Sequence, residues 1–254
     1  MATDDPVNIK ATRTSFRVVE LLHELDGAGV TELADHLDAP KSTVHDHLRT
    51  LHDLEYVVKL DGSYRISTKF LELGEYEREN MLVYEIAKPE LDRLAEQTGD
   101  HANLMIEEHG RGVYIYKSTG TDAARLDTYP GFRTPLHSTA LGKAILSEMP
   151  DDQIREIVDE VGLPRITRYT ITDPDRLFEE IETIREQGYA LDRQERAEGI
   201  QCVGAPVNAD GGDRLAAVSV SGLASKMRGD RLTEEVPELV KRTANKIEVA
   251  LKYS

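Results

Sequence analysis

The stretch Thr31–Ser67, TELADHLDAPKSTVHDHLRTLHDLEYVVKLDGSYRIS, decides the fold. Its apolar residues first recur at helical spacing, in two runs separated by Pro40, which cannot continue a helix. An upstream run at 15–25, with Phe16 on its apolar face, has the same spacing, so three helices are expected. Thr14 and Thr31 are the expected N-caps of the first two. The spacing then changes to two, and Asp61-Gly62 supplies the positive φ angles of a tight hairpin. Three helices and a hairpin in this order predict a winged helix-turn-helix, whose last helix enters the major groove of DNA.

The third helix has one face that must be buried and one that must be exposed. Val44, Leu48 and Leu51 recur at i, i+4 and i+7 and form the apolar stripe. The opposite face and the hairpin then supply the candidate DNA contacts. These are Lys41, Ser42, Thr43, His45, Asp46 and Arg49 on the helix, and Lys59 and Arg65 on the hairpin. Asp46 has two interpretations, an acceptor of a hydrogen bond from cytosine N4 or a solvated surface acid.

The charge of the chain is unusual for a protein of this class. Its 47 Asp and Glu against 31 Lys and Arg give a net charge of −16. Residues 1–83 alone hold sixteen acids against nine bases. Since a DNA-binding surface is normally basic, either the chain does not bind DNA or it works in molar salt. We favour the halophilic interpretation, because an acidic surface keeps a protein hydrated there and counterion release then contributes little to affinity.

The rest of the sequence predicts a linker and a second domain. A helix at 68–83 is polar around most of its circumference, which is typical of a helix that bridges domains or pairs with its copy. Beyond it the pattern predicts helices near 86–97, 138–146, 151–161, 174–188 and 235–251. It also predicts strands near 102–108, 112–118, 189–191, 201–207 and 214–221, with a turn at 210–212. The fold class is therefore α+β with a mainly antiparallel sheet, divided into 9–67, 68–83 and 84–254.

Several protein classes are excluded by what the sequence lacks. Cys202 is the single cysteine, so no intrachain disulfide can form and a reducing cytoplasm is expected. No apolar run approaches the ~20 residues of a membrane span, and the acidic N-terminus is unlike a signal peptide. There is no dinucleotide fingerprint, P-loop or zinc-type cysteine pair, and Ser138 lacks a nucleophile elbow. We expect no enzyme, no cofactor and no membrane partner.

Two further segments, PLHSTALGKAIL at 135–146 and GYALDRQERAEGIQCVGAPV at 188–207, are similar to segments of a known protein family. With PKSTVHDHLRTL, which looks like a recognition helix, and AAVSVSG, they make nearly the whole chain resemble the IclR family of transcription regulators. The resemblance implies an N-terminal winged helix, a linker helix and a C-terminal effector domain related to GAF domains. It also implies a double-stranded DNA operator as partner, and dimers through the N-terminal part that commonly pair into a tetramer.

The resemblance further implies a small organic acid as effector. The family's pocket positions correspond here to Ala140, Leu141, Asp192, Cys202, Ser219 and Ser221. Ala140 and Leu141 begin a helix, whose free N–H groups and positive dipole suit a carboxylate. Candidate apolar lining residues are Met105, Ile106, Tyr114 and Leu136.

Other interpretations stay open at this point. From spacing alone, Cys202 is a plain buried cysteine, and Ser219 and Ser221 are hydroxyls that bond neighbouring strands. The chain as a whole could be an enzyme or carrier of organic acids whose winged helix binds proteins. It could also be a metal sensor using His101, His109 or His137. His45 and His47 cannot share a metal, since side chains two apart on a helix point about 200° apart.

Overall fold

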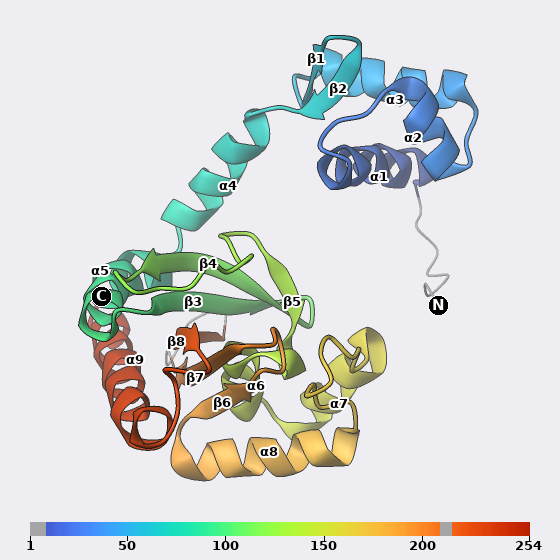
Figure 1. Ribbon diagram of the computed structural model, residues 1–254. Helices are drawn as coiled ribbons and strands as arrows, with labels where there is room; N and C mark the ends of the chain where they lie inside the picture. The colour runs from blue at the N-terminus through green and yellow to red at the C-terminus, as the bar shows by residue number, and fades with distance from the viewer. Residues whose placement is uncertain (1–8, 209–214) are drawn as a thin grey trace. The chain divides into compact units, whose positions relative to one another are not determined.

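The computed structural model describes residues 9–208 and 215–254, and the chain divides into two compact units (Figure 1). The first unit ends at Asn80 and the second begins at Met81, so the expected linker range 68–83 runs across this division. The turn predicted at 210–212 lies outside the described residues. None of the described helices is both long and apolar enough to cross a bilayer.

The first unit has the element order of a winged helix-turn-helix. Its elements are α1 (Lys10–Glu24), α2 (Val30–Leu37), α3 (Lys41–Asp53), β1 (Val57–Leu60), β2 (Ser63–Ile66) and α4 (Lys69–Glu79). Strands β1 and β2 pair antiparallel with Leu60 opposite Ser63. Asp61 and Gly62 between them have φ of 50° and 85°, as the predicted tight turn requires.

The core of the first unit corrects three details of the sequence prediction. Val44 and Leu48 of α3 are fully buried as expected, but Phe16 of α1 is 60% exposed, because Val18, Leu21 and Leu22 form the inward face instead. Thr14 does not cap α1, which begins earlier; its hydroxyl donates to the carbonyl of Lys10 one turn before. Thr31 does not cap α2 either, since Gly29 holds that position.

The second unit is built on one antiparallel sheet. Its elements are α5 (Leu82–Thr98), β3 (His101–Glu108), β4 (Arg111–Thr119), β5 (Arg133–Pro135), α6 (Ala140–Ser147), α7 (Asp151–Val161), α8 (Pro174–Gln187), β6 (Ala190–Arg193), β7 (Ile200–Val207), β8 (Ala216–Leu223) and α9 (Val236–Lys252). The six strands lie in the order β5-β4-β3-β8-β7-β6, and every neighbouring pair is antiparallel. The predicted α+β class is thereby confirmed.

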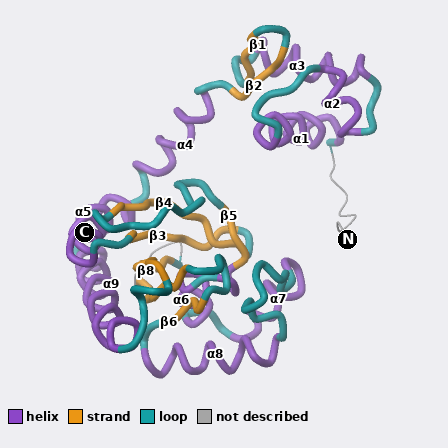
Figure 2. Tube along the Cα trace, in the orientation of Figure 1, coloured by secondary structure: helices purple, strands orange, loops and turns teal. Residues whose placement is uncertain are grey.

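Helices cover both faces of this sheet (Figure 2). Helices α5 and α9 bury one face together with Val218 and Val220 of β8. Helix α6 lies on the other face, to which Ala217 of β8 belongs, and α8 packs against α6. Because side chains alternate along a strand, Ser219 and Ser221 point to the α6 side.

Helix α6 lies against β7 at a contact that only glycine permits. A Cβ at Gly204 would come 2.8 Å from the carbonyl carbon and oxygen of Ala140, the first residue of α6. Thr139 caps this helix, and its hydroxyl accepts a hydrogen bond of 2.9 Å from the N–H of Gly142. The cap and the close contact together fix the first turn of α6 above the sheet.

Removal of the Thr139 cap should destabilise the second unit. Thr139→Val keeps the shape of the side chain but removes the acceptor, so the second unit should lose about 0.5–2 kcal/mol of unfolding free energy. Thr139→Ser keeps the acceptor and serves as the matched control. Urea denaturation followed by circular dichroism measures both variants, and equal losses in the two would contradict the role of the cap.

Candidate functional site

The exposed face of α3 presents every helix residue that the sequence predicted for it. Lys41, Ser42, Thr43, His45, Asp46 and Arg49 are all exposed. The side chain of Asp46 is 82% exposed and lies 3.7 Å from Nδ1 of His45, and that of Arg49 is 75% exposed and lies 3.9 Å from Asp53. Contacts this long and this exposed hold the side chains weakly, so they can turn toward a ligand.

The hairpin presents the two predicted cations. Nζ of Lys59 lies 5.3 Å from the centre of the Tyr64 ring. The guanidinium of Arg65 lies 3.4 Å from the carboxylate of Asp26. A backbone bridge between Ala28 and Tyr64 joins β2 to the segment before α2, so the hairpin is anchored to the helical part of this unit.

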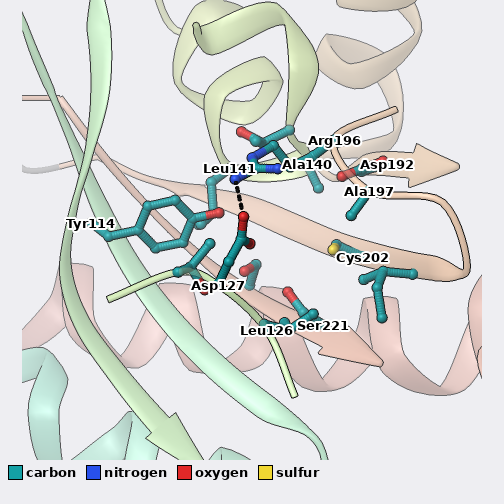
Figure 3. A pocket seen from close by; sticks show the side chains of 14 residues that line it. Tyr114, Leu126, Asp127, Ala140, Leu141, Asp192, Arg196, Ala197, Cys202 and Ser221 are labelled. Carbon is teal, nitrogen blue, oxygen red and sulfur yellow. Dashed lines mark hydrogen bonds and ion pairs between the residues drawn. The ribbon is translucent and has the colours of Figure 1, made fainter. Parts of the chain in front are cut away.

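In the second unit, the six predicted effector residues line one pocket that is partly open to solvent (Figure 3). Ala140 and Leu141 come from the start of α6, and the other four come from the sheet. The remaining lining residues are Tyr114, Leu126, Asp127, Thr128, Thr139, Arg196, Ala197 and Ile200. Of the four predicted apolar lining residues only Tyr114 lies there; Met105, Ile106 and Leu136 are buried in the cores.

The sheet register creates a polar row on the floor of the pocket. Asp192 of β6 lies opposite Cys202 of β7, and Cys202 lies opposite Ser221 of β8. Nδ2 of Asn103 donates to the hydroxyls of Ser219, at 3.3 Å, and Ser221, at 3.2 Å. Each serine oxygen therefore acts as an acceptor toward Asn103, which leaves its own O–H to donate elsewhere.

Asp192 is a buried acid that is influenced by one negative and one positive side chain. It is 2% exposed, and its carboxylate accepts a 2.6 Å hydrogen bond from the N–H of Glu195. Burial, and then the charge of Glu195, raise the pKa of Asp192 to about 7, while Lys143 acts in the opposite direction. Burial also raises the pKa of the Cys202 thiol well above its usual range, so this wall of the pocket is neutral.

A buried lysine that sequence reasoning missed ties the pocket together. Lys143 of α6 is fully buried, and its Nζ donates to Glu180 of α8 at 3.0 Å and to Glu195 at 2.8 Å. It thereby joins the helix that supplies Ala140 and Leu141 to the segment that follows Asp192. The one signal in the sequence was a lysine inside the apolar run TALGKAIL.

Two other charged residues of the pocket were also missed. Arg196 and Asp127 come from different loops and form an ion pair of 3.1 Å, drawn as the dashed line in Figure 3. The Arg196 guanidinium also lies 4.9 Å from the centre of the Phe132 ring. Neither loop has a periodic pattern, so no sequence signal brought these two positions together.

The three histidines of the metal-sensor interpretation have different surroundings. Nε2 of His101 bonds the carbonyl of Ala124, and Nε2 of His137 lies 3.2 Å from the carbonyl of Pro164. His109 lies in the turn between β3 and β4 with φ of 54°. Within residues 9–208 and 215–254, no three His, Cys, Asp or Glu side chains gather so that they could hold a metal ion.

Comparison with known proteins decides the family. The model of the C-terminal domain of the bacterial transcriptional regulator IclR matches residues 78–249, and that of the IclR helix-turn-helix domain matches 14–61. The chain belongs to the IclR family of transcriptional regulators. It is a DNA-binding regulator with a C-terminal ligand-binding domain, as the sequence resemblance implied.

Single relatives align with almost the whole length of this IclR-family protein. The probable HTH-type transcriptional regulator ArcR of Halobacterium salinarum is 32% identical over 97% of this chain and 95% of its own length. The HTH-type transcriptional regulator KdgR of Escherichia coli is 30% identical over 98% of this chain and 95% of its own. The crystal structure of the Thermotoga maritima IclR is 30% identical and superposes with a TM-score of 0.76, covering 95% of this chain and 98% of that one.

The raised pKa of Asp192 predicts a pH dependence of stability. Because folding raises this pKa from 3.8 to about 7, the protonated form stabilises the fold and its contribution is lost as pH rises between these values. Asp192→Asn imitates the protonated form. From about pH 5 to about pH 8, the second unit of the native regulator should lose up to ~2 kcal/mol relative to this variant. Urea denaturation at several pH values measures the difference.

The control is Asp122→Asn, which neutralises an acid outside the pocket that lies 3.6 Å from Lys226. Its pH profile should run parallel to that of the unchanged protein. Parallel profiles for Asp192→Asn as well would contradict the assigned protonation.

Proposed function

We propose that this IclR-family regulator binds an operator through α3 and its wing, and that a small organic acid in the pocket of the second unit controls this binding. The observation that carries the proposal is the convergence of the α6 amides and the polar sheet row on one cavity. In this proposal the DNA contacts are made by Lys41, Ser42, Thr43, His45, Asp46 and Arg49 of α3 and by Lys59 and Arg65 of the wing. The effector contacts are made by Ala140, Leu141, Asp192, Cys202, Ser219 and Ser221.

Exposure of the polar face of α3 supports the operator part. A recognition helix must offer side chains that are not already engaged, and Arg49 is the longest donor near its middle. An arginine that reads guanine in the major groove contributes about 1–3 kcal/mol of discrimination. Asp46 suits the complementary task of accepting from cytosine N4.

Arg49 provides the test. Arg49→Ala should weaken binding to a DNA fragment from upstream of the protein's own gene by about 1–3 kcal/mol, measured by gel shift in molar potassium chloride. Arg176→Ala is the matched control, because it removes the same charge from an exposed side chain of α8. No specific fragment at any salt concentration, together with turnover of an organic acid, would favour the enzyme interpretation and overturn the proposal.

Three features of the pocket support an acidic effector. The N–H groups of Ala140 and Leu141 belong to the first turn of α6, where amides have no acceptor inside the helix. These amides and the positive end of the helix dipole attract a carboxylate. The raised pKa of Asp192 and the neutral Cys202 thiol reduce the repulsion that an anion would otherwise meet on the sheet.

A thermal-shift screen with carboxylates, sugar acids and aromatic acids tests the effector. A ligand that binds the folded state raises the melting temperature by mass action. Ser221→Ala should reduce the shift produced by the hit, whereas Ser225→Ala, an exposed serine outside the pocket, should not. A hit that stabilises both variants and Asp192→Ala as strongly as the native protein would contradict this pocket.

Self-association belongs to the same proposal. Helix α4 has no buried residue within its unit, and its Leu71, Leu73 and Tyr76 are exposed. A mostly polar helix that exposes a few apolar side chains in this way is suited to pair with its copy. We propose a dimer, further paired into a tetramer, that presents two winged helices to half-sites about one DNA turn or a multiple apart.

A further inference from the structure

The charged pair at the pocket has one firmly placed partner and one exposed partner. The side chain of Arg196 is only 17% exposed and stacks on Phe132, whereas that of Asp127 is 69% exposed. An ion pair with so exposed a partner contributes little stability, because water screens the charge. The guanidinium therefore stays in the pocket lining, and its present counter-ion can be exchanged at low cost.

A second polar group in the same cavity lacks a partner. Tyr114 is 6% exposed, and its hydroxyl points into the pocket (Figure 3). No residue of the described ranges forms a hydrogen bond with this hydroxyl. Burial raises its pKa well above the usual range, so it stays a neutral donor. Because the hydroxyl faces the cavity and is not engaged by another side chain, its O–H is available to donate to an anion bound there.

We infer that Arg196 and Tyr114 bind the carboxylate of the effector, and that Asp127 occupies the place of this carboxylate on Arg196 until the effector arrives. The inference rests on the proposed function and deepens it, since none of these three residues was among its contacts. Asp127 is itself a carboxylate on a loop, so it is a tethered competitor with the same chemistry as the ligand. The exchange keeps the guanidinium paired throughout, and the buried site favours the ligand that also reaches the α6 amides.

Isothermal titration with three carboxylates and their neutral amides tests the inference. The probes are acetate, pyruvate and benzoate, against acetamide, pyruvamide and benzamide at constant ionic strength. Asp127→Asn removes the competitor and should tighten carboxylate binding roughly two- to fivefold, the scale of one exposed ion pair. Arg196→Gln should weaken it on the order of 10- to 100-fold, and amide binding should respond to neither change.

Matched variants separate this exchange from a general effect of charge or folding. Asp122→Asn changes the same loop by the same charge outside the pocket, so its affinity for carboxylates should equal that of the native protein. The expected gain for Asp127→Asn cannot arise from a folding defect, which only weakens binding. Tyr114→Phe should weaken carboxylate binding. The factor by which Asp127→Asn tightens this binding should be the same with and without Tyr114→Phe.

The outcomes distinguish the inference from the proposed function. Carboxylate binding that Ser221→Ala weakens but that Arg196→Gln and Asp127→Asn leave unchanged overturns the inference alone. Absence of a specific operator, with the Arg196 and Asp127 effects as expected, overturns the proposed regulation and leaves the binding assignment standing. Absence of carboxylate binding by every variant overturns both.

Discussion

The close contact between the first turn of α6 and Gly204 of β7 is the constraint on which the pocket depends. It brings two helix amides to the polar row formed by Asp192, Cys202 and Ser221, which three different strands supply. A side chain at position 204 would push the helix off the sheet and separate the anion-attracting end from the hydroxyls. Lys143 then stabilises the same arrangement from inside, through Glu180 and Glu195.

The pocket has buried ion pairs around Lys143 and a more exposed ion pair at its opening. Removing one partner of the Lys143 cluster would leave an unpaired charge in the interior, which is strongly destabilising. The Asp127–Arg196 pair at the opening is exposed on one side and weak. The strong interactions thus fix the cavity, while the weak one is the interaction that a ligand can replace. A small acid can change operator binding only through different affinity for two arrangements of the protein.

The sequence predicted periodic features well and local or long-range details less well. The apolar stripe of α3, the Asp61-Gly62 turn and the alternation of Ser219 and Ser221 follow from spacing, and the structure has all three. The predicted start of α1 was wrong. Threonine is a residue type that often caps a helix, but Thr14 lies inside this one. Asp127, Lys143 and Arg196 could not be foreseen, since their contacts join segments distant in the chain and depend on the exact packing of α6. Tyr114 was expected as apolar lining, although its hydroxyl is the group that faces the cavity.

If the pocket and the winged helix are coupled, thermodynamic reciprocity provides a direct measurement of that coupling. If a carboxylate changes operator affinity by some factor, the operator must change carboxylate affinity by the same factor. Titrating the stabilising carboxylate into the native protein, with and without saturating operator DNA, measures this factor from one side, and titrating DNA with and without the carboxylate measures it from the other. Our account predicts two equal factors that differ clearly from one. Tight binding of both ligands with a factor of one would contradict it.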